Sequence, residues 1–445
     1  MSDERIRVAF VHLGCAKNLI DAEKMGGLLE EAGYVVDEDL EAADVIIVNT
    51  CGFISDAKEE SIEEILSLLR GAVDDSPAVI AAGCLAQRYP SELAEGIPEL
   101  SGILGVNDLE EVTSVVESAA RGERLIRVSS SSHGWPDPKL RHRWTPSHIA
   151  YLKIAEGCDR RCSYCAIPLI RGPYRSKPAE DILREAHSLV EEGAREINLV
   201  AQDVTLYRSP GGDVGLNGLL KRLARELPDV WVRILYAHPA GLDEELVETL
   251  SGHANLCSYL DVPLQHASPR ILRAMGRPED PDHVRDFLSD LRRNHPEFSV
   301  RSTFMVGFPT ETEADFEYLT ELVRDLELDD VAIFPFSPED GTPAEGLPEP
   351  VPTRVARERA NALRRIAEES SFSAKQRFVG RELEAVLDQR GANGWLARHR
   401  GQAPEVDGAI VVDGLSDTSL AVGDRLRVRI EGADAVDLWG TACRA

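Results

Sequence analysis

EGCDRRCSYC, residues 156–165, places Cys158, Cys162 and Cys165 at the spacing CxxxCxxC. The run follows a short apolar segment at 150–155, and a proline and glycine turn closes it, so we expect a loop at the end of a β-strand. Thiolates suit iron–sulfur clusters and zinc. A structural zinc site needs four ligands, usually as two pairs, and no second pair lies close by. The spacing therefore favours a 4Fe-4S cluster with one open iron over zinc, or over three free thiols on a tight loop.

The first third of the chain predicts a parallel sheet. Apolar strands are expected at 6–13, 44–48 and 78–82, with helices at 21–32 and 55–70 between them. Strands that read as continuous apolar runs and alternate with helices indicate a parallel sheet covered on both faces. A cysteine closely follows each of the three strands, and these residues are Cys15, Cys51 and Cys84.

These three strand-end cysteines are expected to meet, because ligands of open α/β sheets bind beyond the carboxyl ends of the strands. A single cysteine after a strand is more often a small buried apolar residue. Three of them at the same topological place favour a second three-cysteine cluster instead.

The central part of the chain repeats a strand–helix pattern six times. Strands are predicted at 151–155, 197–201, 231–236, 259–262, 300–306 and 331–336. Six such units form an open (β/α)6 barrel, whose chemistry lies at the carboxyl ends of its strands. Gln202, Gln265 and Gly307 follow three of the predicted strands, on the same side as CxxxCxxC. We expect them to contribute to a cofactor site.

The tail from Phe378 carries short alternating strands separated by glycine and aspartate turns, which indicates a small antiparallel β-barrel. The sequence thus predicts an α/β protein of three domains. We expect an N-terminal parallel α/β cluster domain at 1–125, a linker at 126–147, a barrel at 148–376 and a β-barrel at 377–445.

The chain is acidic, with 77 Asp and Glu residues against 49 Lys and Arg and a net charge of −28. Residues 1–140 hold 27 acidic and 11 basic residues, a net charge of −16. This balance disfavours direct nucleic-acid binding and adhesion to anionic membranes, and it favours a basic partner. The general acidity of proteins from salt-adapted organisms is the alternative explanation.

Location in the cytoplasm is expected, because no apolar run approaches the roughly 20 residues of a membrane-spanning helix. The charged first residues lead directly into a strand pattern, which is unlike a secretory signal. Eight cysteines in a reducing compartment point to metal binding or catalysis rather than to disulfides.

The cysteine loop, with the aromatic Tyr164 before its last cysteine, resembles the cluster loop of radical S-adenosylmethionine enzymes. Together with the three earlier cysteines and the terminal β-barrel, it makes the whole chain resemble the methylthiotransferases. That family combines an N-terminal cluster domain, a radical barrel and a TRAM domain.

Four segments resemble the branch that adds a methylthio group to the β-carbon of an aspartate in a small-subunit ribosomal protein. They are GCAKN at 14–18, EGCDRRC at 156–162, QDVTLY at 202–207 and LDVPLQHAS at 260–268. The tRNA-modifying branch typically has GCQMN, QNVN and QSG at corresponding places. The alternatives are a tRNA adenosine methylthiotransferase and a non-enzymatic iron–sulfur electron carrier or sensor.

The resemblance implies two 4Fe-4S clusters, each on three cysteines, with S-adenosylmethionine as both radical source and methyl donor. Cys158, Cys162 and Cys165 would hold the radical cluster, and the strand-end set would hold the auxiliary cluster that carries the sulfur. Tyr164 would pack near the adenine, and the cofactor would also contact Gln202, Gln265 and Gly307. The implied partners are a basic small-subunit ribosomal protein and an external electron donor.

Overall fold

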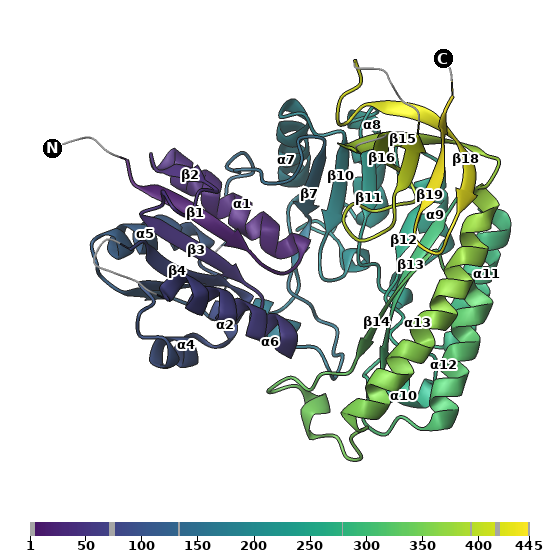
Figure 1. Ribbon diagram of the computed structural model, residues 1–445, viewed down its shortest axis with the longest axis horizontal. Helices are drawn as coiled ribbons and strands as arrows, with labels where there is room; N and C mark the ends of the chain where they lie inside the picture. The colour runs from purple at the N-terminus through teal and green to yellow at the C-terminus, as the bar shows by residue number, and fades with distance from the viewer. Residues whose placement is uncertain are drawn as a thin grey trace.

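A computed structural model describes residues 5–70, 76–131, 134–277, 279–391, 394–413 and 419–443. An N-terminal α/β unit lies beside a larger unit of strands and helices, and a small C-terminal β-barrel packs at one end of the larger unit (Figure 1). None of the helices formed by the described residues is both long and apolar enough to cross a membrane.

The N-terminal unit contains a six-stranded parallel sheet in the order β2-β1-β3-β4-β5-β6. Its strands are β1 (Arg7–His12), β2 (Val35–Asp37), β3 (Val45–Thr50), β4 (Ala78–Gly83), β5 (Gly102–Gly105) and β6 (Leu125–Arg127). Its helices are α1 (Ala16–Glu31), α2 (Ser55–Leu69), α3 (Cys84–Arg88), α4 (Pro90–Gly96), η1 (Leu109–Glu111) and α5 (Val112–Ala120). Apolar residues of α1 and α5 pack on one face of the sheet, and those of α2, α3 and α4 pack on the other.

The parallel sheet covered on both faces agrees with the sequence prediction. Three details differ from it. The sheet has six strands instead of three, because the sequence did not reveal the short strands β2, β5 and β6. Helix α1 begins at Ala16, five residues before the predicted start, because its first turns bury polar side chains against the barrel and lack an apolar stripe. Strand β6 spans the domain end expected at residue 125, and it lengthens the sheet by pairing with β5.

The central unit holds six parallel strands in two adjacent groups, β11-β10-β7 and β12-β13-β14. The strands are β7 (Ile149–Lys153), β10 (Glu196–Val200), β11 (Trp231–Ile234), β12 (Tyr259–Asp261), β13 (Ser299–Val306) and β14 (Asp330–Pro335). One parallel bridge, Val232 with Leu256, lies where the two groups meet. The pattern matches the predicted open barrel of six units.

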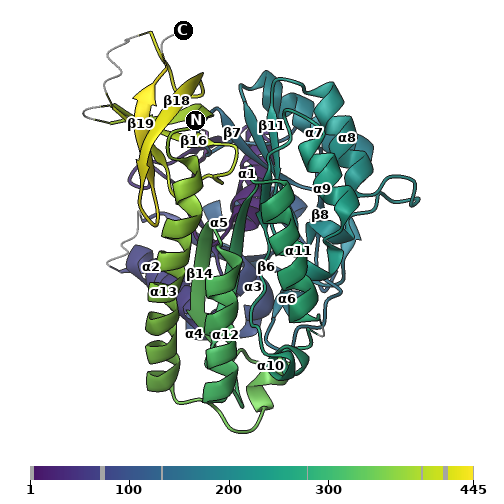
Figure 2. The same cartoon turned by 90° about the vertical axis from the view of Figure 1, so that its right-hand side faces the viewer.

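Helices cover the outside of this barrel (Figure 2). The long ones are α7 (Ala179–Glu191), α8 (Leu216–Glu226), α9 (Glu244–Ser251), α11 (Pro281–Asn294), α12 (Glu313–Leu326) and α13 (Thr353–Lys375). Shorter elements at the strand ends are β8 (Ala155–Glu156), α6 (Ile167–Arg171), β9 (Arg175–Ser176), η2 (Val204–Leu206), η3 (Pro239–Gly241), α10 (Pro269–Ala274) and η4 (Pro343–Gly346). A single apolar core joins the strands to the long helices.

The C-terminal unit is a closed barrel in the order β15-β16-β17-β19-β18, preceded by the short helix η5 (Gln376–Phe378). Its strands are β15 (Glu382–Arg390), β16 (Gly394–His399), β17 (Ile410–Asp413), β18 (Arg425–Ala433) and β19 (Leu438–Ala442). Most pairs are antiparallel as predicted, but β17 and β19 are parallel. The sequence did not reveal β19, because its inward positions are Leu438, Gly440 and Ala442, and glycine and alanine give a weak apolar signal.

The segment between the first two units packs tightly on α1. A Cβ atom added to Gly27 would lie 2.3 Å from the backbone nitrogen of Arg141. The Arg141 guanidinium is buried and pairs with Glu23 of α1 and, at 3.2 Å, with Glu185 of α7. This segment therefore joins the N-terminal sheet to the barrel.

We expect Gly27→Ala to destabilise the protein. Alanine favours a helix interior over glycine by about 1 kcal/mol, but here its methyl group would collide with the Arg141 backbone, at a cost of about 1–3 kcal/mol. Chemical denaturation measures the change. Gly96→Ala is the matched control, because a Cβ atom there meets open space. Equal stability of the two variants would contradict close packing of the linker on α1.

Candidate functional site

The three strand-end cysteines meet at the carboxyl edge of the N-terminal sheet. Cys15 immediately precedes α1, Cys51 follows β3, and Cys84 begins α3 directly after β4. The loops are in contact: a Cβ atom on Gly14 would lie 3.0 Å from Cys51 Cβ and 3.2 Å from its Sγ. The Cys15 thiol also acts electrostatically on the other two thiols. The structure thus brings this predicted set together.

The CxxxCxxC loop lies between β8 and α6 at the carboxyl end of β7. Gly157 adopts φ +77°, and a Cβ atom there would lie 2.2 Å from the Pro173 carbonyl oxygen, so only glycine fits. The Ser163 amide and hydroxyl donate to the carbonyls of Met275 and Ala274, each at 2.8 Å. The loop is therefore held on both sides, and its three thiols act electrostatically on one another.

Burial raises the pKa of five of these six thiols. It raises the pKa of Cys84 to about 11 and that of Cys165 to about 12. Cys15 differs: desolvation raises its pKa, but the Lys17 and Arg171 cations and the backbone N–H groups of Lys17 and Asn18 together lower it by more. The net shift of its pKa is therefore downward. Thiols with a raised pKa hold their protons until a cation displaces them, so metal loading at these positions must release protons.

The donor sets fit iron–sulfur clusters. Among the residues that the structure describes, no three His, Cys, Asp or Glu side chains converge on one point as the ligands of a single ion do. A cubane cluster binds each thiolate through a different iron, so its ligands stand further apart than those of one ion. Thiolates are the usual ligands of iron–sulfur clusters, and each of the two sets offers three of them.

Two of the predicted cofactor residues have polar atoms near the cysteine loop. The Gln202 amide donates to Glu156 at 2.7 Å, and its Oε1 atom is buried without a partner among the described residues. The Tyr164 hydroxyl accepts a hydrogen bond from Arg277 at 3.3 Å, and its ring packs beside Met275 and Phe308. Gln202 thus offers an acceptor to a ligand that brings a donor.

The other two predicted residues have special backbone conformations at the ends of neighbouring strands. Gln265 has φ +68°, unusual for a residue with a side chain, and its backbone bonds to Thr303 and Met305 at 2.7 Å each. Gly307 has φ +74°, and a Cβ atom there would lie 2.3 Å from that of Ala356 in α13. Close helix packing therefore accounts for glycine at position 307.

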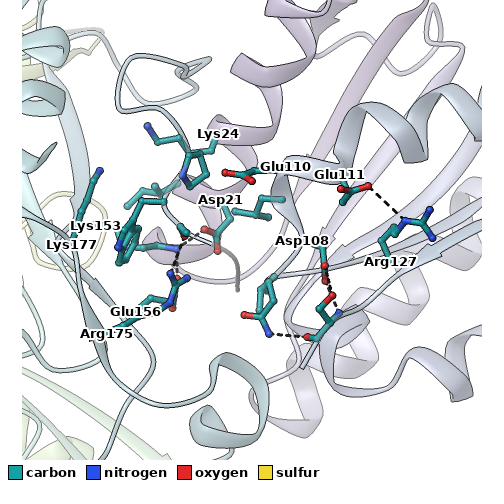
Figure 3. Close-up of a pocket in the computed structure, with 18 of the residues that line it drawn as sticks. Asp21, Lys24, Asp108, Glu110, Glu111, Arg127, Lys153, Glu156, Arg175 and Lys177 are labelled. Carbon is teal, nitrogen blue, oxygen red and sulfur yellow. Dashed lines mark hydrogen bonds and ion pairs between the residues drawn. The ribbon is translucent and has the colours of Figure 1, made fainter. Parts of the chain in front are cut away.

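A buried ion network that sequence reasoning missed lies between the two cysteine sets. Arg171 of α6 binds Asp21 at 2.8 Å, Glu156 at 3.0 Å and the Cys84 sulfur at 3.1 Å. Lys153 of β7 contacts the same two carboxylates (Figure 3). Burial raises the pKa of Glu156, but Arg171 and Lys153 outweigh it, so the pKa lies below its ordinary value. The network ties the cysteine loop of the barrel to the edge of the N-terminal sheet.

The sequence held a signal for this network. Asp21 and Lys153 are charged residues in α1 and β7, two elements whose side chains are mostly buried. A charge in such an element requires a partner. The partners could not be assigned, because they lie far apart in the chain.

A cavity of about 380 Å³ opens beside the network, between the N-terminal unit and the barrel. Asp108, Glu110 and Glu111 line one side. The other side is lined by Lys153, Arg175 of β9 and Lys177, which follows β9 (Figure 3). Glu110 forms no ion pair with any described residue. The cavity thus has an acidic wall with at least one free carboxylate.

Three family models match successive parts of the chain. They are Uncharacterized protein family UPF0004 at residues 7–105, the Radical SAM superfamily at 152–323 and the TRAM domain at 379–443. The Radical SAM match implies a 4Fe-4S cluster and S-adenosylmethionine as cofactors. The three matches correspond to the three structural units.

Curated relatives match nearly the whole chain. A ribosomal protein uS12 methylthiotransferase RimO from Desulforudis audaxviator is 45% identical over 98% of this chain and 96% of its own length. The RimO protein of Geobacter sulfurreducens is 39% identical over 99% of both chains. The chain belongs to the RimO family. It is therefore a radical S-adenosylmethionine methylthiotransferase, as the sequence resemblance implied.

Solved structures agree on the fold of this RimO family member. The radical S-adenosylmethionine methyltransferase TsrM from Kitasatospora setae has a TM-score of 0.57 at 15% identity, over 77% of this chain and 74% of its own. The cobalamin-dependent radical enzyme OxsB has a TM-score of 0.53 at 13% identity, over 82% of this chain and 56% of its own. At such identities the likeness concerns the fold alone.

We expect Arg171→Met to destabilise the contact between the two units strongly, because Asp21 and Glu156 would lose a buried cation. Breaking one side of a buried ion pair costs about 3–5 kcal/mol. Arg184→Met is the control: its ion pair with Asp181 is largely exposed and worth about 0–1 kcal/mol. Denaturant unfolding measures both variants. Equal stability of the two would contradict the structural role of Arg171.

Proposed function

We propose that the chain methylthiolates the β-carbon of an aspartate in ribosomal protein uS12, by radical hydrogen abstraction and sulfur insertion. S-adenosylmethionine would serve as both radical source and methyl donor. The full-length relatives are uS12 methylthiotransferases, which supports this substrate. The observation that carries the proposal is the placement of two three-thiol sets on either side of Arg171.

Each set would have its own role. Cys158, Cys162 and Cys165 would hold the cluster that, with S-adenosylmethionine, supplies a radical able to take hydrogen from an unactivated C–H bond. The strand-end cysteines would hold the auxiliary cluster. Gln202 Oε1 would accept a hydrogen bond from the cofactor, and Tyr164, Gln265 and Gly307 would shape its site. An external donor would supply the electrons.

The charge of the protein supports a basic protein substrate. The first 140 residues carry a net charge of −16, and the free carboxylate of Glu110 lies in the cavity between the units. The C-terminal barrel offers little attraction to RNA phosphates, because Glu382 and Glu384 stand opposite Arg429 and Arg427 across neighbouring strands. A ribosomal protein is therefore favoured over tRNA, and direct nucleic-acid binding is not part of the proposal.

We also infer domain limits at 1–125, 148–376 and 377–445, with a linker at 126–147, and a cytoplasmic location. The main elements of each unit fall within these limits, apart from the end of β6. The cytoplasmic location follows from the proposed substrate, because the enzyme must reach ribosomal protein there.

The substrate proposal predicts a mass increase of one methylthio group on a uS12 peptide after reaction of anaerobically reconstituted protein with S-adenosylmethionine, reductant and uS12. Peptide mass spectrometry locates the group on an aspartate. Digested tRNA treated in parallel should stay unmodified. Modification of tRNA instead would favour the tRNA-modifying alternative, and absence of 5′-deoxyadenosine would favour an electron carrier or sensor.

A separate prediction concerns the two cysteine sets. The wild-type protein should hold about eight irons per chain, as two cubane clusters require. Replacing Cys15, Cys51 and Cys84 with alanine should reduce this to about four, keep S-adenosylmethionine cleavage and abolish sulfur insertion. Replacing the other set should abolish both activities. Cys443→Ala, outside both sets, should retain the full iron content; loss of cleavage in the first triple variant, with its fold intact, would contradict separate roles.

A further inference from the structure

Lys17 is a buried cation that forms no ion pair with a carboxylate among the described residues, although its charge acts on the neighbouring Cys15 thiol. It lies in the first turn of α1, two residues after Cys15, and is 8% exposed. Its ammonium group sits 3.5 Å from the centroid of the Tyr236 ring, and among the described residues it forms no hydrogen bond and no ion pair. The other buried lysines of the described chain all pair with carboxylates, and they are Lys24, Lys153, Lys177 and Lys375.

The position of Lys17 joins the two halves of the site. Tyr236 follows β11 at the carboxyl end of the barrel, with φ +65°, and its backbone N–H donates to Asp261 at 3.1 Å. Lys17 therefore reaches from the edge of the N-terminal sheet to the end of the barrel where the cofactor residues lie. Cys15, beside it, is exposed to solvent. A ligand that approaches Cys15 would come close to this ammonium group.

The neighbouring charged groups already have partners. The Arg171 guanidinium is shared among Asp21, Glu156, Asn18 and Cys84. Glu156 is also bound by Lys153, and Asp261 accepts the Tyr236 amide. Lys17 is thus the cation near Cys15 whose N–H donors remain available.

Burying an ammonium group is unfavourable unless an anion or hydrogen-bond acceptor compensates it. The Tyr236 ring supplies part of the compensation through its negative face. A lysine has three N–H donors, and the ring leaves donors free. Ionisable groups held in unusual surroundings are enriched at functional sites.

We infer that Lys17 binds the carboxylate of the substrate aspartate and so selects an acidic side chain beside Cys15. The inference rests on the proposed function. The β-carbon of aspartate is bonded directly to the carboxylate carbon, so a cation that holds the carboxylate also fixes the position of the carbon to be modified. The methionyl part of S-adenosylmethionine also has a carboxylate that a lysine can bind. The experiment therefore distinguishes the substrate carboxylate from the cofactor carboxylate.

The test measures binding of uS12 to anaerobically reconstituted protein, with either Asp or Asn at the modified position. Wild-type protein should prefer Asp. Lys17→Met, which keeps the side-chain length without the charge, should weaken binding of the Asp form by about tenfold or more and abolish the preference over Asn. Lys17→Arg should keep the preference. Lys221→Met removes an equal charge from an exposed site on α8 and should bind as wild type does.

Several outcomes would overturn the inference. One is a Lys17→Met protein that still prefers Asp, and another is equal weakening of the Asp and Asn forms. A third is reduced S-adenosylmethionine affinity with the Asp preference retained, which would assign Lys17 to the cofactor. Iron content and the melting midpoint check the fold, and Lys17→Gln replaces Lys17→Met if the latter does not fold. Failure of the proposed function is distinct, because wild-type protein would then add no methylthio group to uS12.

Discussion

The Arg171 guanidinium makes the interaction on which the arrangement of the site depends. It binds Asp21 of the N-terminal unit, Glu156 of the barrel and the sulfur of Cys84, with almost no contact with solvent. Removing these charges from water is costly, and only simultaneous contact among all of them offsets the cost. The two cysteine sets are therefore held in one relative position rather than on units that move independently.

The other junctions follow the same principle. Arg141 of the linker segment binds Glu23 and Glu185, and so connects α1 to α7. At the far end, Arg398 of the C-terminal barrel binds Glu196 of β10 at 2.9 Å, and His148 lies 2.8 Å from Asp388. Buried ion pairs specify geometry more than they add stability. This suits an enzyme whose reacting groups come from different units.

The charges that remain unpaired are informative for the same reason. Within the described part of the chain, Lys17 is buried beside Cys15 without a carboxylate partner, and Glu110 lines the cavity without an ion pair. Nearly all other buried charges of the described residues are paired, so Lys17 marks a place where a substrate can supply the partner. Glu110, which is exposed, adds a negative charge at the cavity for a basic protein. A substrate aspartate would supply a carboxylate for Lys17, and the basic residues of the protein that carries it would supply a cation for Glu110.

Local periodicity and spacing in the sequence were enough to predict the α/β class, the sheet with three strand-end cysteines, the barrel of six units and the cysteine loop. Periodicity missed the start of α1, since buried polar residues interrupt the apolar stripe there, and it missed β19, whose inward positions include a glycine. The packing of separate units, which the sequence did not reveal, brings Arg171 against Cys84 and Glu156 and places Lys17 over Tyr236. A charge in the sequence shows that a partner is needed, but its identity depends on how separate units pack together.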